Sequence, residues 1–459
     1  MTDTRNRARK RLLTLLATLV VVIAVSALGI ARLRGPSVTS QPVLGGGTVV
    51  TLKREALPMA MGGGTLVAST PKNVTLKLST RDADAGAHAT HAPGSKDGLV
   101  TTLSITTDTF EIAKRYRSME GPHADYDVRV DGSLPPDGGA RPRELWWWKG
   151  ALIELFDEND RPLGQEFMCH LNIDVDAKGR ESEFPTTKVN VKRLLTLTQG
   201  EPRFELPAGV GLPVASDEVW SFVFQVLNHN RDGVFHAKQR LTLYFVRDAD
   251  LFAPIDALTW HGTYIWVSVS KSDPDALAWD EKQCHCCTPL GPRALEATNN
   301  SRAGRATDPE GRVIVGHWTV PPGKNTWAFP LSRAAPEFAP DGERLFATWT
   351  HVHPFATEVR LIAHAPGCDP KVVARSEIES VSGDAGVGLK AIRSPAFADG
   401  AELPHGATYE LAVDYDNTSG RAQDSMTSFG MFVDDRAWKR PEWAERATSG
   451  MDSSCGLGP

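Results

Sequence analysis

The chain has 459 residues, which is enough for two or three domains of ordinary size. Charged residues make up 23% of the sequence and hydrophobic residues 41%, as expected of a globular protein. The formal net charge is −6, and basic residues do not gather in a stripe beyond the N-terminus, so nucleic acid is not an expected partner.

The first segment of the chain is basic and then apolar. Basic residues between Arg5 and Arg11 precede an apolar run from Leu12 to Ile30, which is just long enough to span a bilayer. Positive charge before such a run holds the N-terminus in the cytoplasm. Val25-Ser26-Ala27 fits a signal-peptidase site, so cleavage stays open. We predict a signal anchor or signal peptide at residues 1–35, with the main body extracytoplasmic and either membrane-anchored or secreted.

The rest of the chain shows many short runs that alternate apolar and polar residues, separated by turn residues. Examples are Val74 to Leu78, Leu99 to Ile105 and Tyr264 to Val269. This pattern, with few helical periods, predicts an all-β protein of two consecutive antiparallel β-sandwich domains. Phe252-Ala253-Pro254 is a reasonable junction. The predicted segments are a flexible spacer at 36–64, an N-terminal sandwich at 65–255, a C-terminal sandwich at 256–440 and a tail at 441–459.

Two histidines separated by one residue, His351 and His353, form the strongest candidate site. On a strand, residues two apart point to the same face, so both imidazoles would lie side by side, as a copper or zinc site needs. Met426 opens a later strand, and a thioether with two imidazoles suits copper. Hydrogen-bonded or surface histidines, and a methionine that fills the core, are the plainer alternatives.

These residues resemble the second domain of the copper type II, ascorbate-dependent monooxygenases, such as the peptidylglycine α-hydroxylating and dopamine β-monooxygenases. The resemblance covers the layout from about residue 120 to 435. It implies two tandem jelly-roll-like domains that each bind one copper. It also implies that His351, His353 and Met426 hold the catalytic copper.

The resemblance further implies a histidine copper site in the first domain, where this sequence departs from the pattern. His170 matches the second histidine of the family's pair, but Cys169 stands where the first should be. Leu227 stands where the third should be, and His229 follows two residues later. Either Cys169, His170 and His229 bind copper, or this first site is degenerate.

The sequence is consistent with two functions. The first is an exported copper-dependent monooxygenase that hydroxylates a C–H bond of a small-molecule or peptide substrate, using O₂ and an external reductant such as ascorbate. The alternative is a non-catalytic extracytoplasmic protein that binds copper or a partner. The membrane is an expected partner only through the N-terminal helix.

A cysteine-rich segment and one further histidine remain. In an exported protein, Cys284, Cys286 and Cys287 are expected to form disulfide bonds, with Cys368 or Cys455 as candidate partners. Copper acceptance by the segment is the other interpretation. His317 precedes a turn at the end of a predicted strand, and we expect it to be structural rather than a ligand.

Overall fold

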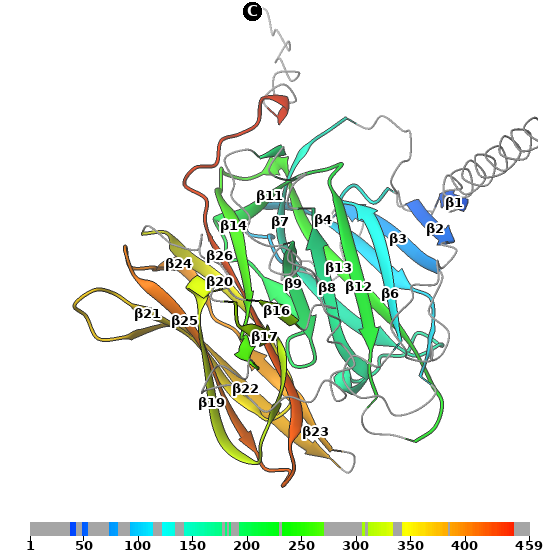
Figure 1. Ribbon diagram of the computed structural model, residues 1–459. Helices are drawn as coiled ribbons and strands as arrows, with labels where there is room; N and C mark the ends of the chain where they lie inside the picture. Colours follow the sequence, from blue (N-terminus) through cyan, green and yellow to red (C-terminus); the bar gives the residue numbers. More distant parts are fainter. Residues whose placement is uncertain are drawn as a thin grey trace, which may run out of the picture.

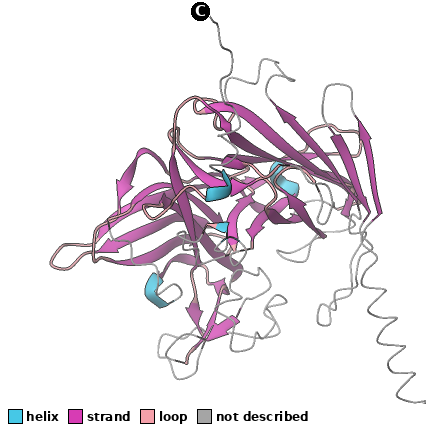
Figure 2. Ribbon diagram, turned by 90° about the horizontal axis from the view of Figure 1, so that it is seen from above, coloured by secondary structure: helices cyan, strands magenta, loops and turns pink. Residues whose placement is uncertain are grey.

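The computed structural model describes the greater part of the chain and shows it to be built from strands. Short helical turns, such as η3 (Gln165–Phe167) and η4 (Leu331–Arg333), are the exception. Figure 2 shows the dominance of strands directly. The prediction of an all-β protein is therefore confirmed. The described residues are 37–42, 48–53, 73–80, 92–112, 122–133, 142–176, 180, 183–184, 192–228, 232–269, 305–307, 311–333, 342–383 and 386–444.

The first half of the chain forms two sheets packed face to face. One contains, in spatial order, β1 (Ser37–Pro42), β2 (Thr48–Lys53), β3 (Asn73–Thr80), β4 (Gly98–Thr107), β13 (Phe235–Leu251), β7 (Leu145–Phe156) and β11 (Val210–Ala215), with β5 (Phe110–Ile112) and β10 (Arg203–Glu205) beside β13 and β7. The other contains β6 (His123–Arg129), β12 (Val219–Val226), β8 (Met168–Val175) and β9 (Arg193–Thr198). Alternate residues such as Leu103, Leu243, Ile173 and Phe222 fill the space between them, which is the arrangement of a sandwich.

The second half forms another pair of packed sheets. One contains β14 (Asp256–Tyr264), β26 (Gln423–Asp434), β20 (Arg344–Val352) and β24 (Ala396–Glu402), with β18 (His317–Val320) beside β26. The other contains β19 (Gly323–Pro330), β25 (Thr408–Asn417), β21 (Ala356–His364), β22 (Lys371–Gly383) and β23 (Gly386–Arg393). A small sheet of β15 (Val267–Ser268), β17 (Val313–Val315) and β16 (Arg305–Thr307) completes the pairing.

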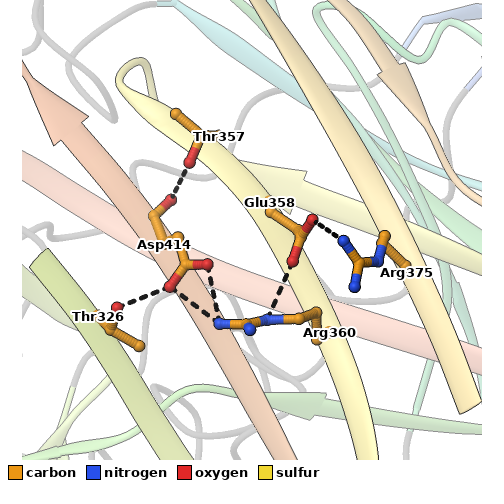
Figure 3. Close-up of polar contacts among 6 residues, drawn as sticks. All are labelled: Thr326, Thr357, Glu358, Arg360, Arg375 and Asp414. Carbon is orange, nitrogen blue, oxygen red and sulfur yellow. Dashed lines mark hydrogen bonds and ion pairs between the residues drawn. The ribbon is translucent and has the colours of Figure 1, made fainter. Parts of the chain in front are cut away.

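The outer face of the five-stranded sheet carries ion pairs between neighbouring strands. Arg360 on β21 contacts both Asp414 on β25, at 2.8 Å, and Glu358, at 3.1 Å (Figure 3). Arg375 on β22 reaches the same Glu358 at 2.6 Å. The charged side chains are 20–50% exposed, so this face is solvated and the apolar face turns inward.

The two sandwiches lie side by side (Figure 1). The apolar core of the first extends to side chains of the second half, such as Trp260 and Phe432, and forms a shared core, while the second sandwich also has a core of its own. β11 pairs in parallel with β14, which joins the larger sheet of the first half to the β14–β26–β20 sheet. Phe432 of β26 packs on Phe204 and Trp148 of the first half, with ring centroids 5.0 and 5.7 Å away. The sheet around β26 therefore has two buried faces, one toward each half.

Two predictions made from the sequence need correction. In the described residues no helix is long and apolar enough to cross a membrane, and residues 1–35 lie outside them, so the predicted transmembrane helix is not supported. The predicted disulfide bonds are not supported either. The two described cysteines, Cys169 and Cys368, are free thiols, and Cys284, Cys286, Cys287 and Cys455 lie outside the described residues.

Candidate functional site

Strand β20 presents one row of side chains to the first sandwich and the other row to its own core. Trp349 and His351 alternate with Thr350 and Val352, as the two-residue period of a strand requires, and His353 follows directly after the strand. The Trp349 indole belongs to the shared core, and its Nε1 donates to the carbonyl of Leu194 on β9 at 3.0 Å. His351 is therefore aimed toward the first sandwich, and the ring of His353 lies beside that of His351.

The Trp349 ring is accommodated by a glycine on the adjacent strand. Gly430 of β26 is the register partner of Trp349, and a Cβ atom there would collide with the indole nitrogen. A glycine at this point allows a close approach that any other residue would block. The placement of the β20 row thus depends on a small residue 81 positions later in the sequence, counted from 349 to 430.

His170 of β8 meets His351 from the opposite sandwich. Their ring centroids are 5.3 Å apart, and those of His351 and His353 are 5.9 Å apart. The Sγ atom of Cys169 lies 3.2 Å from Nδ1 of His170. The structure therefore brings the sequence-predicted residues His170, Cys169, His351 and His353 into one neighbourhood between the two halves.

Met426 lies on β26 between two histidines. His317 of β18 is its register partner on one side. On the other side the pairing of β20 with β26 ends at Val352 and Thr427, the residues that adjoin His353 and Met426 in sequence. Strands two apart in a sheet are separated by roughly 10 Å, yet the rings of His317 and His353 approach to 5.7 Å. The two rings thus lean toward each other over β26, where Met426 is buried.

We refer to His170, His317, His351 and His353 as the histidine cluster. Each of these side chains is 3–7% exposed. Burial lowers the pKa of His170 to about 3, with smaller contributions from Arg193 and the neighbouring histidines. Burial also lowers the pKa of His351 well below its ordinary value, assisted by the other three rings of the cluster. His170 and His351 are therefore neutral at physiological pH, the form in which an imidazole binds a metal.

The arrangement does not by itself constitute a metal centre. Among the residues that the structure describes, no group of three or more His, Cys, Asp or Glu side chains is placed so that it could hold a metal ion. The expectation of an assembled metal site is corrected accordingly: the donor types suit copper, but the side chains do not surround one point. His229, the proposed third ligand in the first domain, lies outside the described residues.

Sequence reasoning missed His317, which was expected to be structural. Its ring contact with His353 arises from the pairing of β18 with β26, whose positions in the sequence are more than a hundred residues apart. The only local signal is its place on a short strand, and that signal does not reveal which strand becomes its neighbour.

Comparisons with known proteins leave the family open. No family model and no curated protein matches this chain. Among solved structures, a mutant oxalate decarboxylase of Bacillus subtilis is 8% identical, with a TM-score of 0.14 and 83% of this chain and 81% of that chain covered. The PBSX exported protein XepA is 11% identical, with a TM-score of 0.12 and coverage of 70% and 93%. Likenesses this low carry no argument about fold or function.

Proposed function

We propose that this protein is a copper-dependent monooxygenase that hydroxylates a C–H bond with O₂ and an external reductant such as ascorbate. The observation that carries the proposal is the approach of His170, His351 and His353 at the contact between two β-sandwiches, with Met426 buried on the adjacent strand β26. Imidazole nitrogens and a thioether sulfur form the mixed donor set that suits copper in both of its oxidation states. The tandem jelly-roll-like layout of the copper type II monooxygenases is part of this proposal.

Each residue has a distinct part in the proposal. His351, His353 and Met426 would hold a copper ion, and copper would supply the one-electron chemistry that activates O₂. His170, with Cys169 beside it, would form the first-sandwich side of the site. Because the rings do not converge on one point, copper binding requires them to turn about their side-chain torsions, a change that leaves the strands in place.

Burial of the cluster excludes bulk water from the site and keeps the rings of His170 and His351 unprotonated. A neutral ring needs no deprotonation before it coordinates an ion. A dry site also protects a reactive intermediate from side reactions. The packing of the chain thus supplies both the exclusion of water and the neutral form of the rings.

The same burial favours a second candidate, a protein that binds copper without turning over a substrate. Side chains that are 3–7% exposed leave little access for a substrate C–H bond unless local segments move. A copper-binding protein needs only a path for the ion. The two functions share the binding step and differ in oxygen chemistry.

The test measures copper binding and oxygen uptake on the same purified full-length protein. Metal analysis and electron paramagnetic resonance after reconstitution with Cu(II) give the number and the nitrogen ligation of bound ions. An oxygen electrode then measures ascorbate-dependent uptake with a panel of small amides and peptides. We expect bound copper with nitrogen couplings and substrate-dependent uptake. Copper binding without uptake supports the second candidate, and an absence of copper binding refutes both.

Matched variants assign any binding to the cluster. His351→Ala and His353→Ala should abolish tight copper binding, whereas His364→Ala should not. His364 is a half-buried histidine at the end of β21 and is not a member of the cluster. Unchanged binding in His351→Ala and His353→Ala would show that copper binds elsewhere.

A further inference from the structure

A tight turn between β9 and β10 projects from the first sandwich into the second. Thr198 and Glu201 exchange backbone hydrogen bonds of 3.3 and 3.0 Å across it. Gly200 has φ of +88°, a conformation that favours glycine, and a Cβ there would press on Ile392 of the second half. We call residues 198–201 the bridging turn.

The bridging turn binds the second sandwich through successive residues. Oε1 of Gln199 accepts a hydrogen bond from the backbone N–H of Leu389 at 3.1 Å. The Gly200 carbonyl accepts one from the N–H of Ile392 at 2.9 Å. Oε2 of Glu201 accepts one from the N–H of Thr350 at 3.2 Å. The turn is therefore fixed to three separate positions of its neighbour.

The two ends of this turn lie next to two histidines of the cluster. Thr198 is the register partner of His170, and its hydroxyl donates to the Cys169 carbonyl at 3.2 Å. At the other end, Glu201 binds the N–H of Thr350, the residue that immediately precedes His351. A path of a few bonded residues thus connects the backbones that carry the two facing rings.

The side chain of Glu201 lies against the edge of β20, just beyond the point where the pairing of β20 with β24 ends. In the described part of the chain, β24 pairs with β20 as far as Ala347, and Pro395 accepts the next outward N–H, from Thr348. The outward N–H that follows belongs to Thr350 and is taken by the Glu201 carboxyl. The Thr350 hydroxyl is held separately by Ser376 at 2.7 Å. The side chain of Glu201 therefore accepts the backbone hydrogen bond that a neighbouring strand would otherwise accept at this edge.

The carboxyl of Glu201 is buried between the two halves. Glu201 is 8% exposed, and burial raises its pKa to about 8 despite hydrogen bonds from Ser394 and Thr350. Carboxyl groups are rarely buried without a charged partner. Hydrogen bonds from Ser394 and Thr350 therefore hold the Glu201 carboxyl in its buried place.

We propose that Glu201 is a positioning residue, which sets the placement of His351 relative to His170 through the Thr350 N–H. The bridging turn, and not the apolar core alone, then fixes the geometry of the histidine cluster across the two halves. The proposal deepens the proposed function and rests on it for its consequence, which is that copper affinity depends on a residue that does not touch the ion.

The first experiment needs no copper. Full-length protein labelled with ¹⁵N-histidine is examined by long-range ¹H–¹⁵N correlation, which reports the tautomer and surroundings of each ring. Glu201→Ala should shift the ring signals of His170 and His351, and Glu201→Gln, which keeps an acceptor oxygen, should restore them. The control is Glu205→Ala, because Glu205 is an exposed glutamate on the adjoining strand β10.

The second experiment adds Cu(II) to the same variants. Loss of an outer contact of this kind lowers metal affinity by about 10- to 100-fold, so Glu201→Ala should bind that much more weakly than Glu205→Ala, with altered nitrogen couplings. Unchanged ring signals in Glu201→Ala overturn the positioning role. Shifted ring signals in a protein that never binds copper support the positioning role and refute the proposed function. If Glu201→Ala does not fold, Glu201→Asp, which withdraws the carboxyl by one methylene, is judged by the same criteria.

Discussion

Replacement of Glu201 by glutamine should change how the stability of the protein depends on pH. Burial raises the pKa of this carboxyl from 4.5 to about 8 in the folded protein, so the folded state keeps its proton where the unfolded state has lost it. The stability that the protonated group provides is complete below pH 4.5 and is lost as the pH rises through 8. A glutamine carries no proton to lose and should not show this dependence.

The size of the effect follows from the two pKa values. Each pH unit between them lowers the free energy of unfolding by about 1.4 kcal/mol, so the full loss between pH 4.5 and 8 is about 5 kcal/mol. Other groups titrate in the same interval, but they do so in both proteins. The difference in stability between wild type and Glu201→Gln isolates the contribution of the one carboxyl.

Urea unfolding at pH 5, 6, 7, 8 and 9, followed by tryptophan fluorescence, provides the measurement. We expect Glu201→Gln to gain on the wild type steadily from pH 5 to pH 8 and then to level off. A difference that is constant across this range would mean that Glu201 ionises normally in the folded protein. The burial argument for the bridging turn would then be refuted.

Three further substitutions test other parts of the structure. Met426→Ile roughly conserves volume, so it should cost less than about 1.5 kcal/mol of stability. It should also weaken copper binding, as measured by metal analysis after reconstitution with Cu(II), and unchanged binding would remove the thioether from the site. Lys149→Met removes the ion-pair partner of the buried Asp97 carboxylate, which lies 2.7 Å away, and should destabilise the protein by about 3–5 kcal/mol in urea unfolding. A smaller loss of stability would indicate that water reaches the carboxylate. Arg360→Ala removes the partly exposed ion pair with Asp414 and should lower the free energy of unfolding by about 1 kcal/mol or less. A loss above about 2 kcal/mol would show that the outer face is less solvated than its exposure indicates.

Local sequence patterns accounted for much of the fold. Alternation along the chain predicts strands, because the two faces of a sandwich strand meet different surroundings. The same two-residue period predicts that His351 and His353 lie side by side, and the structure places their ring centroids 5.9 Å apart, although β20 ends at Val352. These inferences need only neighbouring residues, which is why one sequence suffices for them.

The remaining features depend on which strands become neighbours. His317 joins the cluster because β18 pairs with β26, and His170 faces His351 because the two halves dock along a shared core. Glu201 gave no signal, since an acidic residue after Gln199-Gly200 reads as an ordinary turn. The positions of ring atoms, which decide whether a metal site is assembled, depend on packing that no local pattern specifies.

The shared core also determines what happens when the chain is divided. A fragment that ends near residue 255 would uncover Trp148 and Phe204, and the complementary fragment would uncover Trp260, Trp349 and Phe432. Contiguous aromatic surface of this kind drives self-association in water. Truncated halves should therefore precipitate when expressed separately and recover solubility when they are produced together, so that each half acts as the solubilising partner of the other.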